Sequence, residues 1–156
     1  TKNAEAGELL AEKLSSVLSK KEPPSGPKVL LLLGLSSFDG GSLWFVKRNS
    51  LHGSVLHAAG GRNAVDRDIS GAPSISMEEL LKIDPDVIIS LVSQETLSEQ
   101  DRQVYLKRIS ELGVLKAVQE NKIGFVVGKQ YMGTGPEILD FVTALNLELE
   151  RLMGGT

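Results

Sequence analysis

Three short runs of apolar residues constrain the fold of this chain more than any other feature of its sequence. They span Lys28 to Gly34 (KVLLLLG), Asp86 to Leu91 (DVIISL) and Ile123 to Val127 (IGFVV). Each run is continuous rather than alternating, which is typical of a strand buried on both faces, as in a parallel sheet. Each is followed by a polar or glycine-rich stretch and then by a helical pattern. This order predicts a three-layer α/β domain built on a parallel sheet.

Helical patterns occupy the segments between these strands. Ser50 is placed to cap a helix over residues 51–59, and Ser76 to cap one over residues 77–83, with Glu79 at the position that a capping box requires. Further expected elements are helices over 3–21 and 102–112, a turn or two over 114–120, a fourth strand near Ala64 and Val65, and a final helix after Pro136 with Ile138, Phe141, Leu145 and Leu149 facing inward. The 3–21 helix is amphipathic and precedes a proline-rich break.

The composition excludes several classes of function. The 156 residues suit one domain, and 17 basic against 20 acidic residues give a net charge of −3 with no basic stripe. We therefore expect no nucleic-acid partner. The absence of cysteine excludes disulfides, cysteine-ligated zinc and thiol catalysis. The longest apolar run, Val29 to Leu33, is far shorter than the roughly 20 residues of a membrane-spanning helix.

Motifs for catalysis or for a cofactor are missing from the sequence. No GxGxxG follows the first strand, no GxxxxGK[ST] occurs, and Gly40 to Trp44 (GGSLW) lacks the closing glycine of a nucleophile elbow. The two histidines, His52 and His57, are five residues apart on a predicted helix, which separates them by about 140° around its axis. They would not converge on one metal ion. We expect a protein that is not an enzyme and that has no cofactor and no metal site.

The candidate ligand-binding residues follow the predicted strands. Ligands of open α/β sheets bind outside the carboxyl ends of the strands, which here lead into residues 35–49, 92–99 and 129–135. Two of these segments are predicted to be glycine-rich loops that carry aromatic and cationic side chains. The candidates are Trp44, Phe45, Arg48, Tyr131 and Met132. The alternative is that the aromatic side chains pack in the core and that the charges are simply solvated.

Four segments together resemble cluster III periplasmic binding proteins, the solute-binding components of ABC transporters. They are GSVLHAAGGRNAV (Gly53–Val65), ISMEELLKIDPDVIISL (Ile75–Leu91), LGVLKAVQENKIGFVVG (Leu112–Gly128) and GPEILDFVTAL (Gly135–Leu145). The resemblance implies two Rossmann-like lobes joined by a long helix, with the ligand in the cleft between them. This sequence resembles only the C-terminal lobe, over residues 27–156, and the end of the bridging helix, over residues 1–22. The N-terminal lobe is expected to lie outside it.

The resemblance also implies partners and a location. The family's ligands are iron siderophores, haem and cobalamin, and its permease docks on an acidic residue of each lobe. Glu95 is the candidate by its position after the second strand, and Glu99 is as good on charge alone. The implied location is the periplasm, or a lipid anchor at the outer face of the cytoplasmic membrane. The family's Pro-Arg in the last segment is Pro136-Glu137 here, so no role of that arginine carries over.

Two other functions remain open from the sequence. The first is a stand-alone α/β sensory or interaction domain derived from this lobe. The second is a small α/β enzyme that uses the loops over 35–49 and 129–135, for which the sequence offers no catalytic acid or base.

Overall fold

The structure is a computed structural model, and it describes residues 26–33, 42–47, 50–65, 74–128 and 137–154. The strands are β1 (Lys28–Leu33), β2 (Ser42–Trp44), β3 (Arg62–Asn63), β4 (Ser74–Ser76), β5 (Val87–Val92) and β6 (Ile123–Val127). The helices are α2 (Leu51–Ala58), α3 (Met77–Ile83), α4 (Glu99–Ser110), α5 (Lys116–Gln119) and α6 (Glu137–Met153). The helix expected over 3–21 and the loop expected over 129–135 lie outside the described residues.

Four strands form one parallel sheet in the order β3-β1-β5-β6. The three strands predicted from the apolar runs are confirmed, and so is their parallel arrangement. The fourth strand lies at Arg62–Asn63, just before the predicted position near Ala64 and Val65. Those two side chains are buried in the core instead.

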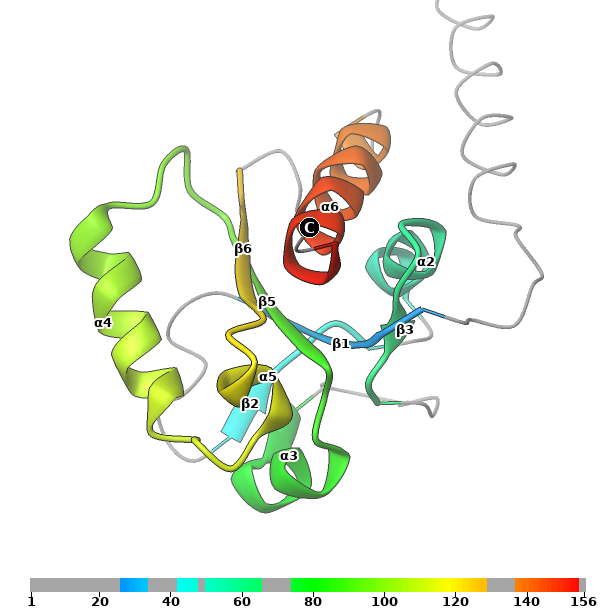
Figure 1. Ribbon diagram of the computed structural model, residues 1–156. Coiled ribbons are helices and arrows are strands. Elements are labelled where there is room, and N and C mark those ends of the chain that lie inside the picture. The colour runs from blue at the N-terminus through cyan, green and yellow to red at the C-terminus, as the bar shows by residue number, and fades with distance from the viewer. Residues whose placement is uncertain (1–25, 34–41, 48–49, 66–73, 129–136, 155–156) are drawn as a thin grey trace, which may run out of the picture.

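Helices cover both faces of this sheet (Figure 1). α2 and α6 lie on one face, and α3, α4 and α5 lie on the other. Along β1, Val29 and Leu31 pack on the α2–α6 side, whereas Leu30 and Leu32 pack on the side of α3 to α5. Successive side chains of a strand point to opposite faces, so a strand covered on both faces is apolar at every position. The predicted three-layer architecture is confirmed.

A second, two-stranded antiparallel sheet was not expected from the sequence. β2 pairs with β4, with Leu43 opposite Ile75 and Trp44 opposite Ser74. The prediction of a loop throughout 35–49 was therefore wrong over Ser42–Trp44, and β4 was missed. Both strands are three residues long, and their partners are distant in sequence, so a local pattern carries little information about them.

Serine side chains cap the amino-terminal ends of α2, α3 and α4. Ser76 Oγ accepts a hydrogen bond from the Glu79 N–H at 3.1 Å, which confirms the predicted cap of α3. Ser98 Oγ accepts from the Asp101 N–H at 3.1 Å, so α4 begins at Glu99 rather than at the predicted Arg102. The predicted inner face of α6 is confirmed: Ile138, Phe141, Leu145 and Leu149 are all buried. No helix of the described segments is long and apolar enough to cross a membrane.

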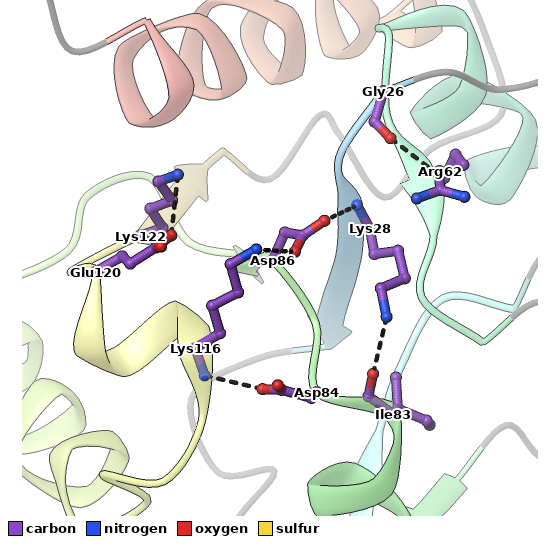
Figure 2. A network of polar contacts seen from close by, with 9 residues as sticks. All are labelled: Gly26, Lys28, Arg62, Ile83, Asp84, Asp86, Lys116, Glu120 and Lys122. Atoms are coloured by element: carbon purple, nitrogen blue, oxygen red, sulfur yellow. Dashed lines mark hydrogen bonds and ion pairs between the residues drawn. The ribbon is translucent and has the colours of Figure 1, made fainter.

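Polar contacts tie together the amino-terminal ends of the strands (Figure 2). Asp86, directly before β5, accepts hydrogen bonds from the Lys28 backbone N–H at 3.0 Å and from Lys116 Nζ at 3.2 Å. Asp84 accepts from the Lys116 backbone N–H at 2.8 Å. Lys28 Nζ donates to the Ile83 carbonyl at 3.2 Å. These contacts join β1, α3, β5 and α5 at one edge of the sheet.

Asp86 is the centre of this network. Partial burial by itself raises the pKa of its carboxyl group, but the hydrogen bonds from Lys28 and Lys116, together with their positive charges, outweigh that effect. The pKa of Asp86 is therefore held below its ordinary value. A carboxylate whose pKa is lowered by folding stabilises the folded state above its unfolded pKa, and this contribution is lost as the pH falls through the folded-state pKa.

A buried pair of hydroxyl groups lies on the α4 face of the sheet. Ser90, in the middle of β5, is fully buried, and its Oγ shares a short hydrogen bond with the Tyr105 hydroxyl of α4. Burial raises the pKa of the Tyr105 phenol above its usual range, against the smaller opposing effect of the bond to Ser90. The hydroxyl therefore stays protonated across the physiological range, and the pair joins α4 to the centre of the sheet.

We expect Tyr105→Phe to lower the free energy of unfolding by about 1–3 kcal/mol, because Ser90 Oγ then loses a buried hydrogen-bond partner. Ser90→Ala should have a similar effect, and the double variant should lose less than the sum of the two single losses. Urea unfolding of the three variants and the wild type measures this coupling. Strictly additive losses would show that the two hydroxyls do not stabilise the fold as a pair.

Asp86→Asn should lower the free energy of unfolding at neutral pH by about 1 kcal/mol, because asparagine offers no charge to Lys116. The gap between wild type and variant should close as the pH falls below about 4, where the wild-type carboxyl group takes up a proton. Urea unfolding over a range of pH tests this. Glu78→Gln is the control, because Glu78 and Lys82 form an exposed pair on α3. A gap that persists in strong acid would contradict the assignment.

Candidate functional site

The carboxyl ends of β1, β5 and β6 lie at one edge of the sheet. Leu33, at the end of β1, pairs with Leu91, and Val92, at the end of β5, pairs with Val127 at the end of β6. From β1 the chain passes to β3 on one side and then crosses to β5 on the other. The two crossings also use opposite faces, with α2 on one and α3 on the other (Figure 1). The order in which successive strands join the sheet thus reverses between β1 and β5, and α/β sheets bind ligands at such a switch point.

Trp44 reaches this edge through an antiparallel extension of the sheet. Phe45 forms a bridge opposite Leu32, so Trp44 comes level with Leu33, the last residue of β1. The Trp44 side chain is 47% exposed, whereas that of Phe45 is fully buried. The alternation follows from strand geometry, in which neighbouring side chains point to opposite faces. Trp44 therefore ends a strand, which corrects the expectation that it lies in a loop.

Phe45 does not share the exposure of Trp44. Its ring is part of the core on the side of α3 to α5, together with Leu43 and Ile75. A fully buried ring has no surface to offer a ligand, so the sequence-based alternative of core packing describes Phe45. Arg48, Tyr131 and Met132, the other candidate ligand-binding residues, lie outside the described residues.

The segment that carries Trp44 is anchored on both sides. The Val46 N–H donates to the Leu31 carbonyl at 2.8 Å, and the Asn63 side chain donates through Nδ2 to the Val46 carbonyl at 2.7 Å. Further along, Ser50 Oγ donates to the Lys47 carbonyl at 2.7 Å and caps α2. Asn63 was not singled out from the sequence, although it is the asparagine of the GGRN segment that carries part of the family resemblance.

Glu95 lies at the same edge, in the exposed stretch between β5 and α4. It follows Val92 by three residues and precedes the Ser98 cap of α4. Glu99, the other acidic candidate, belongs to the first turn of α4, where it accepts a hydrogen bond from Gln103 at 2.8 Å and faces Arg102 at 3.8 Å. The structure thus places Trp44 beside the carboxyl end of β1 and Glu95 just after that of the neighbouring strand β5, at the same edge of the sheet.

Neither the histidine of the α2–α6 contact nor the carboxylates at the amino-terminal edge of the sheet form a metal site in the described segments. The His52 ring packs against the Phe141 ring, with their centroids 5.5 Å apart, in the contact between α2 and α6. Asp84 and Asp86 lie at the amino-terminal edge, where they already accept hydrogen bonds from Lys28 and Lys116. Across the segments that the structure describes, no three His, Asp or Glu side chains gather in a way that could hold a metal ion.

Comparison with known proteins identifies relatives of the chain. Residues 2–131 match the family model described as "Periplasmic binding protein". No protein with a curated description matches. Among solved structures, an ABC transporter substrate-binding protein from Listeria monocytogenes is similar, with 21% identity and a TM-score of 0.62. The match covers 99% of this chain and 57% of that protein.

Two further structures extend the comparison. The ABC-type Fe3+-hydroxamate transport system of Saccharomonospora viridis has 17% identity and a TM-score of 0.65, with 93% of this chain and 48% of that one covered. The periplasmic vitamin B12 binding protein of Vibrio cholerae has 17% identity and a TM-score of 0.67, with 97% and 53% covered. At such identities the likeness establishes the fold. The chain spans about half the length of the structures it matches.

Proposed function

Since the chain belongs to the periplasmic binding protein family, we propose that it is the C-terminal ligand-binding lobe of an ABC-transporter substrate-binding protein. The proposed ligand is an iron-siderophore, haem or cobalamin-like compound. Residues 1–22 would be the end of the helix that bridges to an N-terminal lobe, and residues 27–156 the lobe itself. The sequence resemblance and the similarity to about half of each solved structure support this division.

The observation that carries the proposal is the position of Trp44. It is the one tryptophan of the chain, and about half of its side chain is exposed at the carboxyl edge, where the strand order reverses. An aromatic ring on an anchored strand offers a flat apolar surface with little conformational entropy to lose. The apolar face of a chelate, porphyrin or corrin ring can pack against such a surface.

Other residues of the edge would complete this wall of the site. Arg48 follows Trp44 by four residues in the sequence. We propose that its guanidinium binds an anionic group of the same ligand. Tyr131 and Met132 follow β6, whose end adjoins that of β5. We propose all three as ligand contacts together with Trp44. Phe45 would not contact the ligand; as a buried core residue it would support the segment that carries Trp44.

Release of the ligand would depend on the permease. The family binds small ligands and works with ABC permeases. We propose Glu95 as the acidic docking residue, because it lies exposed beside the proposed binding edge. The protein would act at the outer face of the cytoplasmic membrane, in the periplasm or held by a lipid anchor. No observation favours the alternative of a stand-alone sensory domain.

One lobe supplies only one wall of the cleft, so we expect this chain to bind ligand weakly. A pocket must cover about 70–90% of a ligand's surface to bind it well. A dissociation constant in the millimolar range, about −4 kcal/mol, is expected. Nuclear magnetic resonance titration with a gallium-loaded hydroxamate, a diamagnetic substitute for the ferric complex, and with vitamin B12 and zinc protoporphyrin can detect such binding.

The titration also locates the site. The amide signals of Trp44, Ser93 to Thr96 and Gly128 should shift, and those of Asp84 and Lys116 at the opposite edge should not. Tight binding by this chain alone would show that one lobe holds the whole site, contrary to the proposal. Shifts confined to the amino-terminal edge, or none with any probe, would reject the assignment of the site.

Trp44→Ala should weaken the binding of the responding probe by roughly tenfold, or about 1.4 kcal/mol, because the ligand loses its aromatic surface. Trp44→Phe should restore part of that affinity. The control is Leu147→Ala, which removes an apolar side chain that is 60% exposed on α6. Equal losses in Trp44→Ala and Leu147→Ala would show that the effect is nonspecific.

A further inference from the structure

Two segments pair with the same lateral side of β1, one after the other along its length. β3 covers the first half, where Arg62 pairs with Lys28 and Asn63 with Val29 in parallel register. The second half is covered by Phe45 and Val46, which run antiparallel to β1: Phe45 bridges to Leu32, and the Val46 N–H donates to the Leu31 carbonyl at 2.8 Å. β3 ends after two residues, so a junction between the two segments falls beside the middle of β1.

The Asn63 side chain spans this junction. Its Nδ2 donates to the Val46 carbonyl at 2.7 Å, and its Oδ1 accepts from the Val65 N–H at 3.0 Å. A backbone N–H can only donate, so the bond from Val65 defines which end of the amide is the oxygen and directs the NH2 group to Val46. Both ends of the side chain are engaged, one on each segment.

The bond to Val46 matters because of where its acceptor lies. Val46 is only 5% exposed, and its side chain belongs to the core formed with Leu31 and Val55. A buried backbone carbonyl that loses its partner is costly, so the segment would have to move to let water reach it. Any such movement acts on Trp44, two residues earlier along the same extended backbone.

The pairing of β2 with β4 holds Trp44 less firmly than the pairing of two long strands would. β2 has three residues, and its partner β4 has three as well. Short antiparallel pairs of this kind are marginal on their own. The position of Trp44 therefore depends on the junction with β1 and β3.

We infer that Asn63 is a positioning residue for the ligand site: through Val46 it holds the segment that presents Trp44. The inference rests on the proposed ligand-binding role of Trp44 and assigns to Asn63 no contact with the ligand. It implies that losing the amide donor changes the environment of Trp44 in the free protein and lowers the affinity for ligand.

The tryptophan itself reports on the first part, because the chain contains one tryptophan. Two variants separate the two ends of the amide. Asn63→Asp keeps an acceptor for the Val65 N–H but turns a carboxylate oxygen toward the Val46 carbonyl, whereas Asn63→Ala removes both contacts. Asn146→Ala is the matched control, because Asn146 Nδ2 donates to a backbone carbonyl in the same way, to Ala59 at 2.9 Å, between α6 and α2.

The full chain of each variant is compared at a temperature where circular dichroism shows it to be folded. Both Asn63 variants should shift Trp44 emission to longer wavelength and raise its quenching by acrylamide, and Asn146→Ala should do neither. In the titration with gallium hydroxamate or vitamin B12, the Asn63 variants should bind about tenfold more weakly than wild type. Unchanged Trp44 emission and quenching in Asn63→Asp would overturn the inference, as would an equal change in Asn146→Ala.

Failure of the proposed function would look different. If the wild type binds none of the probes, the ligand-binding role of Trp44 is rejected, and the fluorescence of the unliganded variants still decides whether Asn63 positions Trp44. If the wild type binds and the Asn63 variants change fluorescence without losing affinity, Asn63 orders the segment but does not position it for ligand.

Discussion

β1 and β5 pair in parallel over five positions, from Val29 with Val87 to Leu33 with Leu91, and both strands are buried between two layers of helices. Backbone groups placed so deeply must find partners within the sheet, because water cannot reach them. This pairing orients the other elements. It sets β6 on one side and β3 on the other, and it brings the ends of three strands to a common edge.

The two edges of the sheet differ in how their polar groups are used. At the amino-terminal edge, Asp84 and Asp86 are paired with the lysines that begin β1 and α5, and these contacts join four elements (Figure 2). At the carboxyl edge, the half-exposed Trp44 and the exposed residues after β5 face outward. The paired edge stabilises the fold and the open edge carries the proposed ligand site, so the two lie at opposite ends of the same strands.

The position of Trp44 illustrates how a fold places an exposed side chain through its neighbours. β2 pairs with β4, and the two residues that follow β2 are held by a bridge from Phe45 to β1 and by the Asn63 amide at Val46. Alternation then sends Phe45 into the core and leaves Trp44 at the surface. The same backbone thus contributes the Phe45 ring to the core and leaves the Trp44 ring exposed, where we propose that the ligand binds.

The sequence by itself determined the parts of this protein that depend on local pattern. The runs of residues 28–33, 87–92 and 123–127 became buried parallel strands, because only a doubly covered strand is apolar at every position. The cap of α3 at Ser76 and the inner face of α6 were likewise predictable, since both follow from spacings of three or four residues along one helix. The order of these elements and four short motifs were sufficient to indicate the family.

Only the tertiary structure decided what depends on contacts between distant residues. The pairing of Ser42–Trp44 with Ser74–Ser76 joins residues 30 to 34 positions apart, and the bond from Asn63 to Val46 joins residues 17 positions apart. The place of Phe45 in the core likewise depends on distant residues such as Ile75. Such contacts leave no periodic signal in the chain. They form because the buried edge of β1 needs partners for its backbone groups, and the fold brings those partners to it.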